Sequence, residues 1–229
     1  VIQVNLGSDL VMKIPNEKAI SMVVMLLILL VITSILSVTN KFILRKYTHK
    51  KIRIRNDLHK IFQQFCEREE VDEPKIVESN SFWYRPITHT VGVKNLESSF
   101  LLDAFAFVHE LYHSKDRNRL LKIQSIVSIY TYLTSVLLKI IALYSIWFGK
   151  NISFLKPMLI IDVIILLVCL FLTLLIESYA SKEAISFLKE NKYLQENQLV
   201  ESMAFYAKLS YCYQFITYIL LSLILFYLM

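Results

Sequence analysis

The sequence predicts an all-α membrane protein with four transmembrane helices and a small cytoplasmic α+β element. Of its 229 residues, 55% are hydrophobic, while only 3 are glycine and 4 are proline. This composition is too apolar for one soluble domain of this length and is typical of a helical membrane protein. Four segments reach the ~20 apolar residues needed to cross a bilayer. They are residues 19–38, 123–148, 158–177 and 209–228.

The first apolar segment, residues 19–38, is interpreted as a membrane anchor. Its apolar run is longer than that of a secretory signal peptide, and no small-residue cleavage site follows it. Residues 1–18 form an N-terminal leader with no clear element. Because Met12 is a candidate native start, part of this leader could be foreign to the natural protein. Residues 19–229 are expected to form one membrane-embedded domain.

A cluster of basic residues directly after the first apolar segment sets the expected topology. It contains Lys41, Arg45, Lys46, Lys50, Lys51, Arg53 and Arg55. By the positive-inside rule the cluster marks the cytoplasmic side, where it can also contact anionic head groups of the lipid bilayer. Residues 40–122 and 178–208 are then cytoplasmic. No nucleic-acid motif or aromatic interleaving accompanies the cluster, so the net charge of +6 does not indicate a nucleic-acid partner.

Two shorter elements are expected between the first and second apolar segments. Residues 57–70 have apolar side chains at helical spacing, which predicts an amphipathic helix that could lie on the membrane surface. Further along, a turn at Pro86 leads into a short β-branched strand at residues 88–93.

The strongest functional signal is the pattern HExxH at residues 109–113. On an α-helix, positions i and i+4 lie on the same face, so His109 and His113 can hold one Zn²⁺ between them. Glu110 is then placed as the base that takes a proton from activated water, which is the chemistry of a metallopeptidase. Residues 98–108 contain no glycine or proline and open on a pair of serines suited to capping, which favours a buried helix.

The predicted strand next to this helix has two interpretations. A strand beside the active helix of a zinc peptidase commonly pairs with the extended substrate backbone. Thr88, Thr90 and Val91 are therefore candidate residues of a substrate-binding edge strand. Alternatively, residues 88–93 pack beneath the helix and contact no substrate. The sequence favours neither interpretation.

Zinc held by an HExxH helix needs a third protein ligand, and in one large group of peptidases a glutamate of a later helix supplies it. Glu177 is the candidate, because it lies at the cytoplasmic end of the third apolar segment. The expected topology also places it on the same membrane face as His109 and His113. Glu183 is the second choice. The alternative is that Glu177 is a helix-end charge at the membrane interface.

The second and third apolar segments each contain an ionisable residue, Lys139 and Asp162 respectively. Their expected depths differ by about one helical turn, within reach of a lysine side chain. We expect a structural ion pair, because an unpaired charge inside a membrane is costly. A proton or ion path is the alternative.

The three cysteines are far apart and lack CxxC spacing, so they indicate neither a disulfide framework nor a thiolate metal site.

The order of these motifs resembles that of the YugP-type neutral zinc metallopeptidases, a family of small bacterial membrane proteins. The matching stretches are Tyr84-Arg85-Pro86 with Thr90-Val91-Gly92-Val93, then Val108-His109-Glu110-Leu111-Tyr112-His113, then Ile176-Glu177-Ser178-Tyr179-Ala180-Ser181, and last Leu209-Ser210-Tyr211. The resemblance runs from about residue 20 to the end of the sequence. It departs at Tyr112, where the family has a small residue, and before His109, where the family has alanines and this sequence has Phe107 and Val108. These differences affect the shape of the substrate groove rather than the ligands. The HELxH pattern is also shared, more distantly, with the HtpX-type proteases.

The resemblance implies a zincin-like helix in which His109, His113 and Glu177 bind zinc with water as the fourth ligand. It implies that Glu110 acts first as base and later as proton donor. Candidate donors to the developing oxyanion are His89, Tyr179 and Tyr211, each of which has a packing or interfacial role as its alternative. It also implies an integral protein of a bacterial cell membrane.

The expected function is therefore a zinc-dependent endopeptidase that cleaves membrane-associated proteins or small peptides at the cytoplasmic face. One alternative is a catalytically silent scaffold or binding protein with a structural zinc site, against which the intact Glu110 argues. The other is a transporter or ion channel, for which the apolar segments offer only Lys139 and Asp162. The sequence makes no prediction of the oligomeric state or of the individual substrate.

Overall fold

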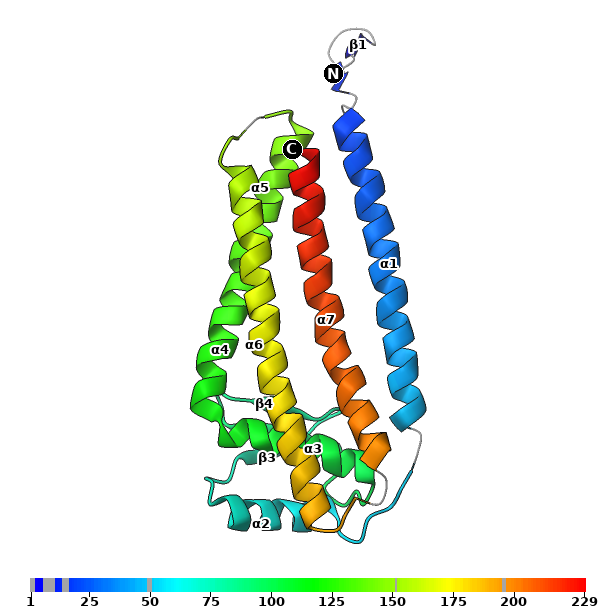
Figure 1. Cartoon of the computed structure of the whole chain (residues 1–229), viewed down its shortest axis with the longest axis vertical. Coiled ribbons are helices and arrows are strands. Elements are labelled where there is room, and N and C mark those ends of the chain that lie inside the picture. The colour runs from blue at the N-terminus through cyan, green and yellow to red at the C-terminus, as the bar shows by residue number, and fades with distance from the viewer. Residues whose placement is uncertain (1–2, 6–10, 14–16, 49–50, 151, 195–196) are drawn as a thin grey trace. The chain divides into compact units, whose positions relative to one another are not determined.

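The computed structural model describes residues 3–5, 11–13, 17–48, 51–150, 152–194 and 197–229, and most of them are helical (Figure 1). The helices are α1 (Glu17–Thr48), α2 (Leu58–Glu69), α3 (Leu101–Lys115), α4 (Arg117–Ile129), α5 (Ser135–Trp147), α6 (Leu155–Glu190) and α7 (Asn197–Leu228), with a π-helical turn at Tyr130–Thr134 between α4 and α5. The strands are β1 (Gln3–Asn5), β2 (Val11–Lys13), β3 (Lys75–Glu78), β4 (Trp83–Arg85) and β5 (Thr90–Val93).

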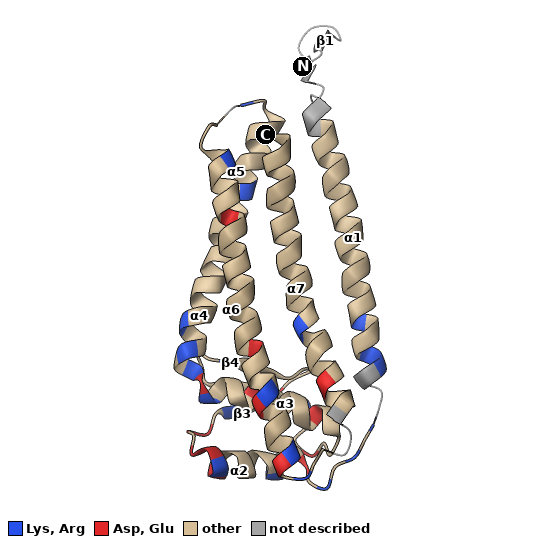
Figure 2. Cartoon of the chain, in the orientation of Figure 1, with Lys and Arg blue, Asp and Glu red and all other residues tan. Residues whose placement is uncertain are grey.

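Within the described residues, four helical segments are long and apolar enough to cross a membrane, which confirms the predicted number. They are Ile20–Lys46, Arg117–Trp147, Leu155–Glu190 and Gln198–Leu228. Each is longer than the predicted apolar segment. The apolar pattern ends at the first polar residues, whereas the backbone continues as a helix until a breaker occurs. Figure 2 shows few charged residues along most of their length, so lipid can cover their exposed apolar side chains.

The leader also contains an element that the sequence did not indicate. Strands β1 and β2 pair in an antiparallel manner, with Val4 opposite Met12. A two-stranded pair of three residues per strand has almost no periodic pattern, so it could not be recognised from the sequence.

The chain forms two compact units, of which the first contains residues 1–38, 127–170 and 212–229. Its helices pack through apolar side chains in two clusters. One cluster contains Met22, Ala142, Ile146, Leu159, Leu225 and Leu228, and the other contains Leu166, Cys169 and Phe215.

A buried polar network crosses this first unit. The ammonium of Lys139 lies 2.7 Å from a carboxylate oxygen of Asp162, which confirms the expected ion pair. Asp162 also accepts hydrogen bonds from the hydroxyls of Ser222 at 2.6 Å and Tyr130 at 2.9 Å, while Lys139 donates to the hydroxyl of Ser135. The side chain of Asp162 is fully buried and that of Lys139 is 4% exposed. The two charges therefore neutralise each other, and hydroxyl groups satisfy their remaining hydrogen bonds.

The second unit contains residues 39–126 and 171–211 and is built around α3. Its three-stranded sheet has the order β3-β5-β4, in which β3 is parallel to β5 and β4 is antiparallel to it. Helix α2 is present, but its apolar face does not lie on a membrane surface as the sequence suggested. Leu58, Ile61 and Phe65 are fully buried in a core shared with α3 and α6. Asp57 caps this helix by accepting a hydrogen bond from the backbone N–H of Lys60 at 2.9 Å.

We predict that the Lys139–Asp162 pair stabilises the first unit and takes no part in catalysis. Changing either residue to leucine leaves the other charge unpaired at membrane depth, at a cost of roughly 2.5–3.5 kcal/mol on insertion scales. Each single change should lower the yield of folded protein in detergent, as measured by size-exclusion chromatography. The double change should restore part of that yield. A well-folded double variant that had lost the function proposed below would disprove the structural role.

Candidate metal centre

Helix α3 positions the HExxH pattern because its apolar residues fix its rotation. Ala104, Phe107, Val108 and Leu111 are fully buried, so this side of the helix is committed to the core. The start of the helix differs from the expected serine cap. Among the described residues no side chain caps the N-terminus, where Phe100 is the N-cap, and the hydroxyl of Ser98 donates instead to the carboxylate of Asp103 at 2.6 Å.

Three side chains predicted as ligands meet at one point in the second unit. His109 and His113 lie one turn apart on α3, with their Nε2 atoms 3.1 Å from each other. The Glu177 carboxylate of α6 reaches both, at 3.2 Å from His109 Nε2 and 3.7 Å from His113 Nε2. Their side chains are only 9–14% exposed. The three candidate ligand atoms lie within 4.8 Å of one another, so the group could hold a metal ion.

The spacing of these atoms fits one shared ion. Ligand atoms at about 2.0–2.2 Å from a tetrahedral metal are roughly 3.3–3.6 Å apart, close to the separations seen here. Without a metal, two imidazole nitrogens facing each other need a proton between them. Burial alone would lower the pKa of His113, but the hydrogen bond and charge of Glu177, together with the charges of Glu110 and Asp116, outweigh burial and raise the pKa. The group thus favours a bound cation.

Ser181, for which the sequence pattern predicts no role, supports the first histidine. The hydroxyl of Ser181 lies 3.3 Å from His109 Nδ1, the nitrogen that does not face the other ligands. Ser181 follows Glu177 by one turn of α6, so a single helix face supplies both a ligand and its support. A hydrogen bond to the second nitrogen of a ligating histidine fixes the ring and its tautomer. The i+4 spacing from Glu177 was the available signal.

Glu110 lies beside the three candidate ligands without being one of them. Burial raises the pKa of Glu110, and the nearby carboxylate of Glu177 adds to this effect. The two histidines and a hydrogen bond from the backbone of Tyr84 in β4 act in the opposite direction, but the net shift is upward. A carboxyl group with a raised pKa is suited to accept and return a proton.

The candidate ligands and Glu110 open into one cavity with a volume of about 490 Å³. Its walls come from β4, α3, α6, α7 and the ends of α1 and α4. The lining residues include Phe82, Trp83, Tyr84, Lys94, Gln124, Met203, Lys208 and Tyr211. This volume is typical of small-ligand and peptide-side-chain sites, so the centre is open to a reactant.

The strand at this cavity is not the one that the sequence indicated. Thr90 and Val91 belong to β5, which is the central strand and is paired on both edges, and Thr88 lies in the preceding turn. A strand paired on both sides has no free backbone groups for a peptide. The edge-strand assignment of these three residues is therefore wrong. The edge next to Glu110 is β4, whose register places Trp83 opposite Gly92.

Gly92 allows this arrangement because the Trp83 indole lies across it. A Cβ atom at position 92 would come within 2.3 Å of the indole ring. The indole nitrogen also donates to the hydroxyl of Ser79 at 2.8 Å. The Trp83 side chain, which lines the cavity, is thus positioned by its packing on Gly92 and by its hydrogen bond to Ser79.

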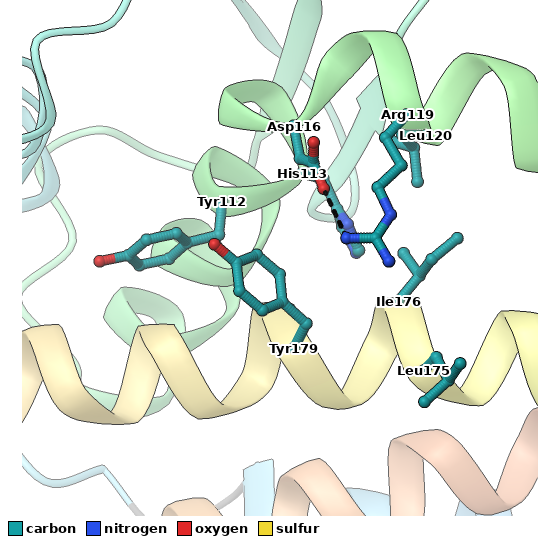
Figure 3. Close-up of a pocket in the computed structure, with 8 residues that line it drawn as sticks. All are labelled: Tyr112, His113, Asp116, Arg119, Leu120, Leu175, Ile176 and Tyr179. Atoms are coloured by element: carbon teal, nitrogen blue, oxygen red, sulfur yellow. Dashed lines mark ion pairs between the residues drawn. The ribbon is translucent and has the colours of Figure 1, made fainter.

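The three candidate oxyanion donors lie in three different places. His89 contacts the Tyr84 hydroxyl with Nδ1 at 2.9 Å and the Asp72 carbonyl with Nε2 at 3.3 Å, so its local contacts are structural. Tyr179 lines a separate cavity with His113, Asp116 and Arg119 (Figure 3). Tyr211 lines the same cavity as Glu110 and is the one candidate brought to it.

Tyr112, which stands where the resembling motif has a small residue, packs in the core. Figure 3 shows its ring directed away from His113. Its hydroxyl donates to Glu69 of α2 at 3.0 Å, and its ring packs edge-on against Phe65 with centroids 5.1 Å apart. Neighbouring helix positions point about 100° apart, which explains why a large residue beside His113 leaves the candidate centre open. The Glu110 cavity is lined by other residues.

Comparisons with known proteins found no match among protein-family models, curated proteins or solved structures. The function is therefore inferred from the geometry of the candidate centre.

We predict that purified protein binds one divalent metal ion per chain through the three converging side chains. Glu177→Gln and His113→Ala should each lower the metal content measured by elemental analysis, because each removes a ligand. Glu110→Gln should retain it, and Ser181→Ala should weaken affinity by about 10–100-fold through loss of the support to His109. Full metal content in Glu177→Gln would identify a different third ligand, with Glu183 the next to test.

Proposed function

We propose that this protein is a zinc-dependent endopeptidase of a cell membrane. The observation that supports the proposal best is the convergence of two histidines and a glutamate beside a second glutamate that lines an open cavity. Two histidines and one carboxylate are the protein ligands of a large class of catalytic zinc sites, in which the fourth position stays open. Zinc also suits imidazole ligands.

The same ligand types occur in non-haem iron oxygenases, which makes iron the second candidate metal. The position of Glu110 favours zinc. It directly follows one ligand, lines the cavity and has a raised pKa, as a proton carrier for hydrolysis requires. Elemental analysis of protein expressed with both metals available would distinguish them.

The residues of this chain divide the hydrolytic work among them. A bound zinc ion would polarise the peptide carbonyl and make water acidic. Glu110 accepts a proton from the attacking water and returns it to the leaving amine, so the carboxyl group ends unchanged. Ser181 keeps the His109 ring in orientation. Tyr211 is the candidate side chain for stabilising negative charge on the carbonyl oxygen.

Strand β4 offers the backbone edge for an extended substrate. It is paired with β5 along one edge, and the backbone of Tyr84 on β4 makes a hydrogen bond to Glu110. A peptide added at this edge would run directly past the base and the candidate ligands. Substrate binding at β4 replaces the role first assigned to residues 88–93.

The wider setting of the proposal follows from the sequence. We infer membership of the YugP-type family, and with it a bacterial cell membrane, from the order of the motifs. We infer a cytoplasmic active site from the basic residues after the first apolar segment. The second candidate function is a silent scaffold with a structural zinc site. A closed site of four protein ligands is typical of structural zinc, whereas the group described here offers three ligands beside a cavity.

We predict that Glu110→Gln binds substrate but cleaves it about 10²–10⁴ times more slowly, which is the usual size of a general-base contribution. Cleavage should also favour flexible segments, because a peptide bond inside a helix cannot present its carbonyl in an extended chain. The measurement uses a reporter that joins a flexible cytoplasmic tail to a transmembrane helix, with cleavage sites mapped by mass spectrometry.

The Glu110→Gln variant is the matched control for that reporter, because it is expected to keep the metal. Equal cleavage by the wild type and Glu110→Gln would show that Glu110 is not the base and that the proposed mechanism is wrong. Cleavage in the middle of the transmembrane helix would contradict the requirement for an extended substrate.

The cytoplasmic position of the centre can be tested by cysteine labelling. In a background without the three native cysteines, a cysteine at Lys50 or Lys192 should be shielded from an impermeant reagent added outside the cell. A cysteine at Asn151 should be labelled, because the expected topology puts the link between the second and third apolar segments, residues 149–157, outside the cell. Positions 50 and 151 lie outside the described residues. The reverse pattern would place the centre outside the cytoplasm.

A further inference from the structure

Lys208 of α7 is a cation in the candidate active-site cavity that the proposed chemistry does not use. Its side chain is half-buried and lines the same cavity as Glu110 and the three candidate ligands. Its ammonium donates to the hydroxyl of Ser178 at 3.4 Å. Ser178 directly follows Glu177 on α6, so Lys208 lies close to the candidate metal centre.

The ion pairs of the described part of the chain do not include Lys208. Other basic side chains near this unit's core, such as Lys115 and Arg68, each contact a carboxylate. Burying an ammonium without a counter-ion costs free energy. Among the described residues, the ammonium of Lys208 has a hydroxyl and not a carboxylate as its partner, so it can bind an anion that enters the cavity.

The overall charge of the cavity points in the same direction. Its charged lining residues are Lys94, Glu110, Glu177 and Lys208. The two lysines balance the two carboxylates, so a bound divalent cation leaves the cavity with a net charge of +2 when the histidines are neutral. A positive, partly enclosed cavity raises the local concentration of anionic reactants.

From these observations we propose that Lys208 forms a substrate subsite that binds a carboxylate of the peptide near the scissile bond. This inference rests on the proposed peptidase function and specifies its substrate class. An extended peptide advances about 3.3–3.6 Å per residue, so a carboxylate at Lys208 belongs to a residue close to the cleaved bond. The carboxylate is either the C-terminus of a short peptide or an Asp or Glu side chain.

Lys94 provides a matched control within the same cavity. It has the same charge, but its side chain is exposed and its ammonium lies 5.6 Å from the centroid of the Phe82 ring. Removing this exposed charge tests for general electrostatic attraction without removing the proposed subsite. Lys208→Met keeps the length and apolar stem of the side chain at position 208.

The experiment measures kcat/KM of the zinc-loaded full chain on pairs of peptides that differ in one carboxylate. One pair has a free or an amidated C-terminus, and the other has Glu or Gln next to the cleavage site. The wild type should prefer the carboxylate in at least one pair by about tenfold, as expected for a hydrogen bond between charged groups. The pair that shows the preference identifies the source of the carboxylate.

The ratio of kcat/KM for the carboxylate peptide to that for its neutral partner should fall to about one in Lys208→Met and stay near the wild-type value in Lys94→Met. In Lys208→Glu the preference should reverse, so that a peptide with Lys at that position is cleaved faster. Metal content should remain at one ion per chain in all three variants, which shows that the centre has folded. A carboxylate preference that persists in Lys208→Met overturns this inference, while peptide cleavage itself leaves the proposed function in place.

A binding measurement makes the test independent of turnover. Fluorescently labelled acid and amide peptides are titrated into the zinc-loaded Glu110→Gln variant, with and without Lys208→Met, and anisotropy gives the dissociation constants. Tighter binding of the acid peptide that disappears with Lys208→Met supports the subsite. Equal binding of both peptides, or binding of neither, overturns it even if the wild type cleaves no peptide.

Discussion

The second unit depends on one requirement, that two imidazoles and a carboxylate lie close enough to share a cation. The contact joins residues 68 positions apart in the sequence, His109 on α3 and Glu177 on α6. It brings the side chains of two helices together across the core of this unit. Ala180 and Ala184 of α6 are fully buried in the same core as Phe107 and Leu111 of α3. The polar centre therefore lies beside a well-packed apolar core to which both helices contribute.

The cavity wall opposite α3 is also held by specific contacts. The turn between β4 and β5 is fixed by Arg117, whose guanidinium donates to the carbonyls of Pro86 at 2.8 Å and Ile87 at 3.1 Å. His89 ends this turn in the left-handed conformation, with φ of 48°, and its ring contacts the Tyr84 hydroxyl. These contacts hold β4 beside Glu110. A residue first considered for catalysis is therefore part of the support for the proposed substrate edge.

Local patterns in the sequence were sufficient for part of this arrangement. The i, i+4 spacing of His109 and His113 determines their common face on any helix, and long apolar runs identify four helices regardless of how they pack. Strand order is different, because it depends on which distant segments pair. The central position of β5 arises when β3, at residues 75–78, joins it in parallel. Residues 88–93 carry no information about that partner, so the same pattern fitted an edge strand equally well.

The Lys139–Asp162 network and the candidate metal centre differ in how completely their hydrogen bonds are satisfied. In the first unit, Asp162 accepts from Lys139, Tyr130 and Ser222, so its charge is neutralised by permanent neighbours. Such closure suits a structural network, since a new ligand would have to displace an existing partner. In the second unit, the nitrogens of His109 and His113 face each other and Glu177, and the cavity beside them contains Glu110 and Lys208. The histidines and Glu177 can share a bound cation, and Lys208 can bind an anion. Such unsatisfied groups beside a cavity are typical of a ligand-binding or catalytic site. This contrast is why we assign stability to the first group and chemistry to the second.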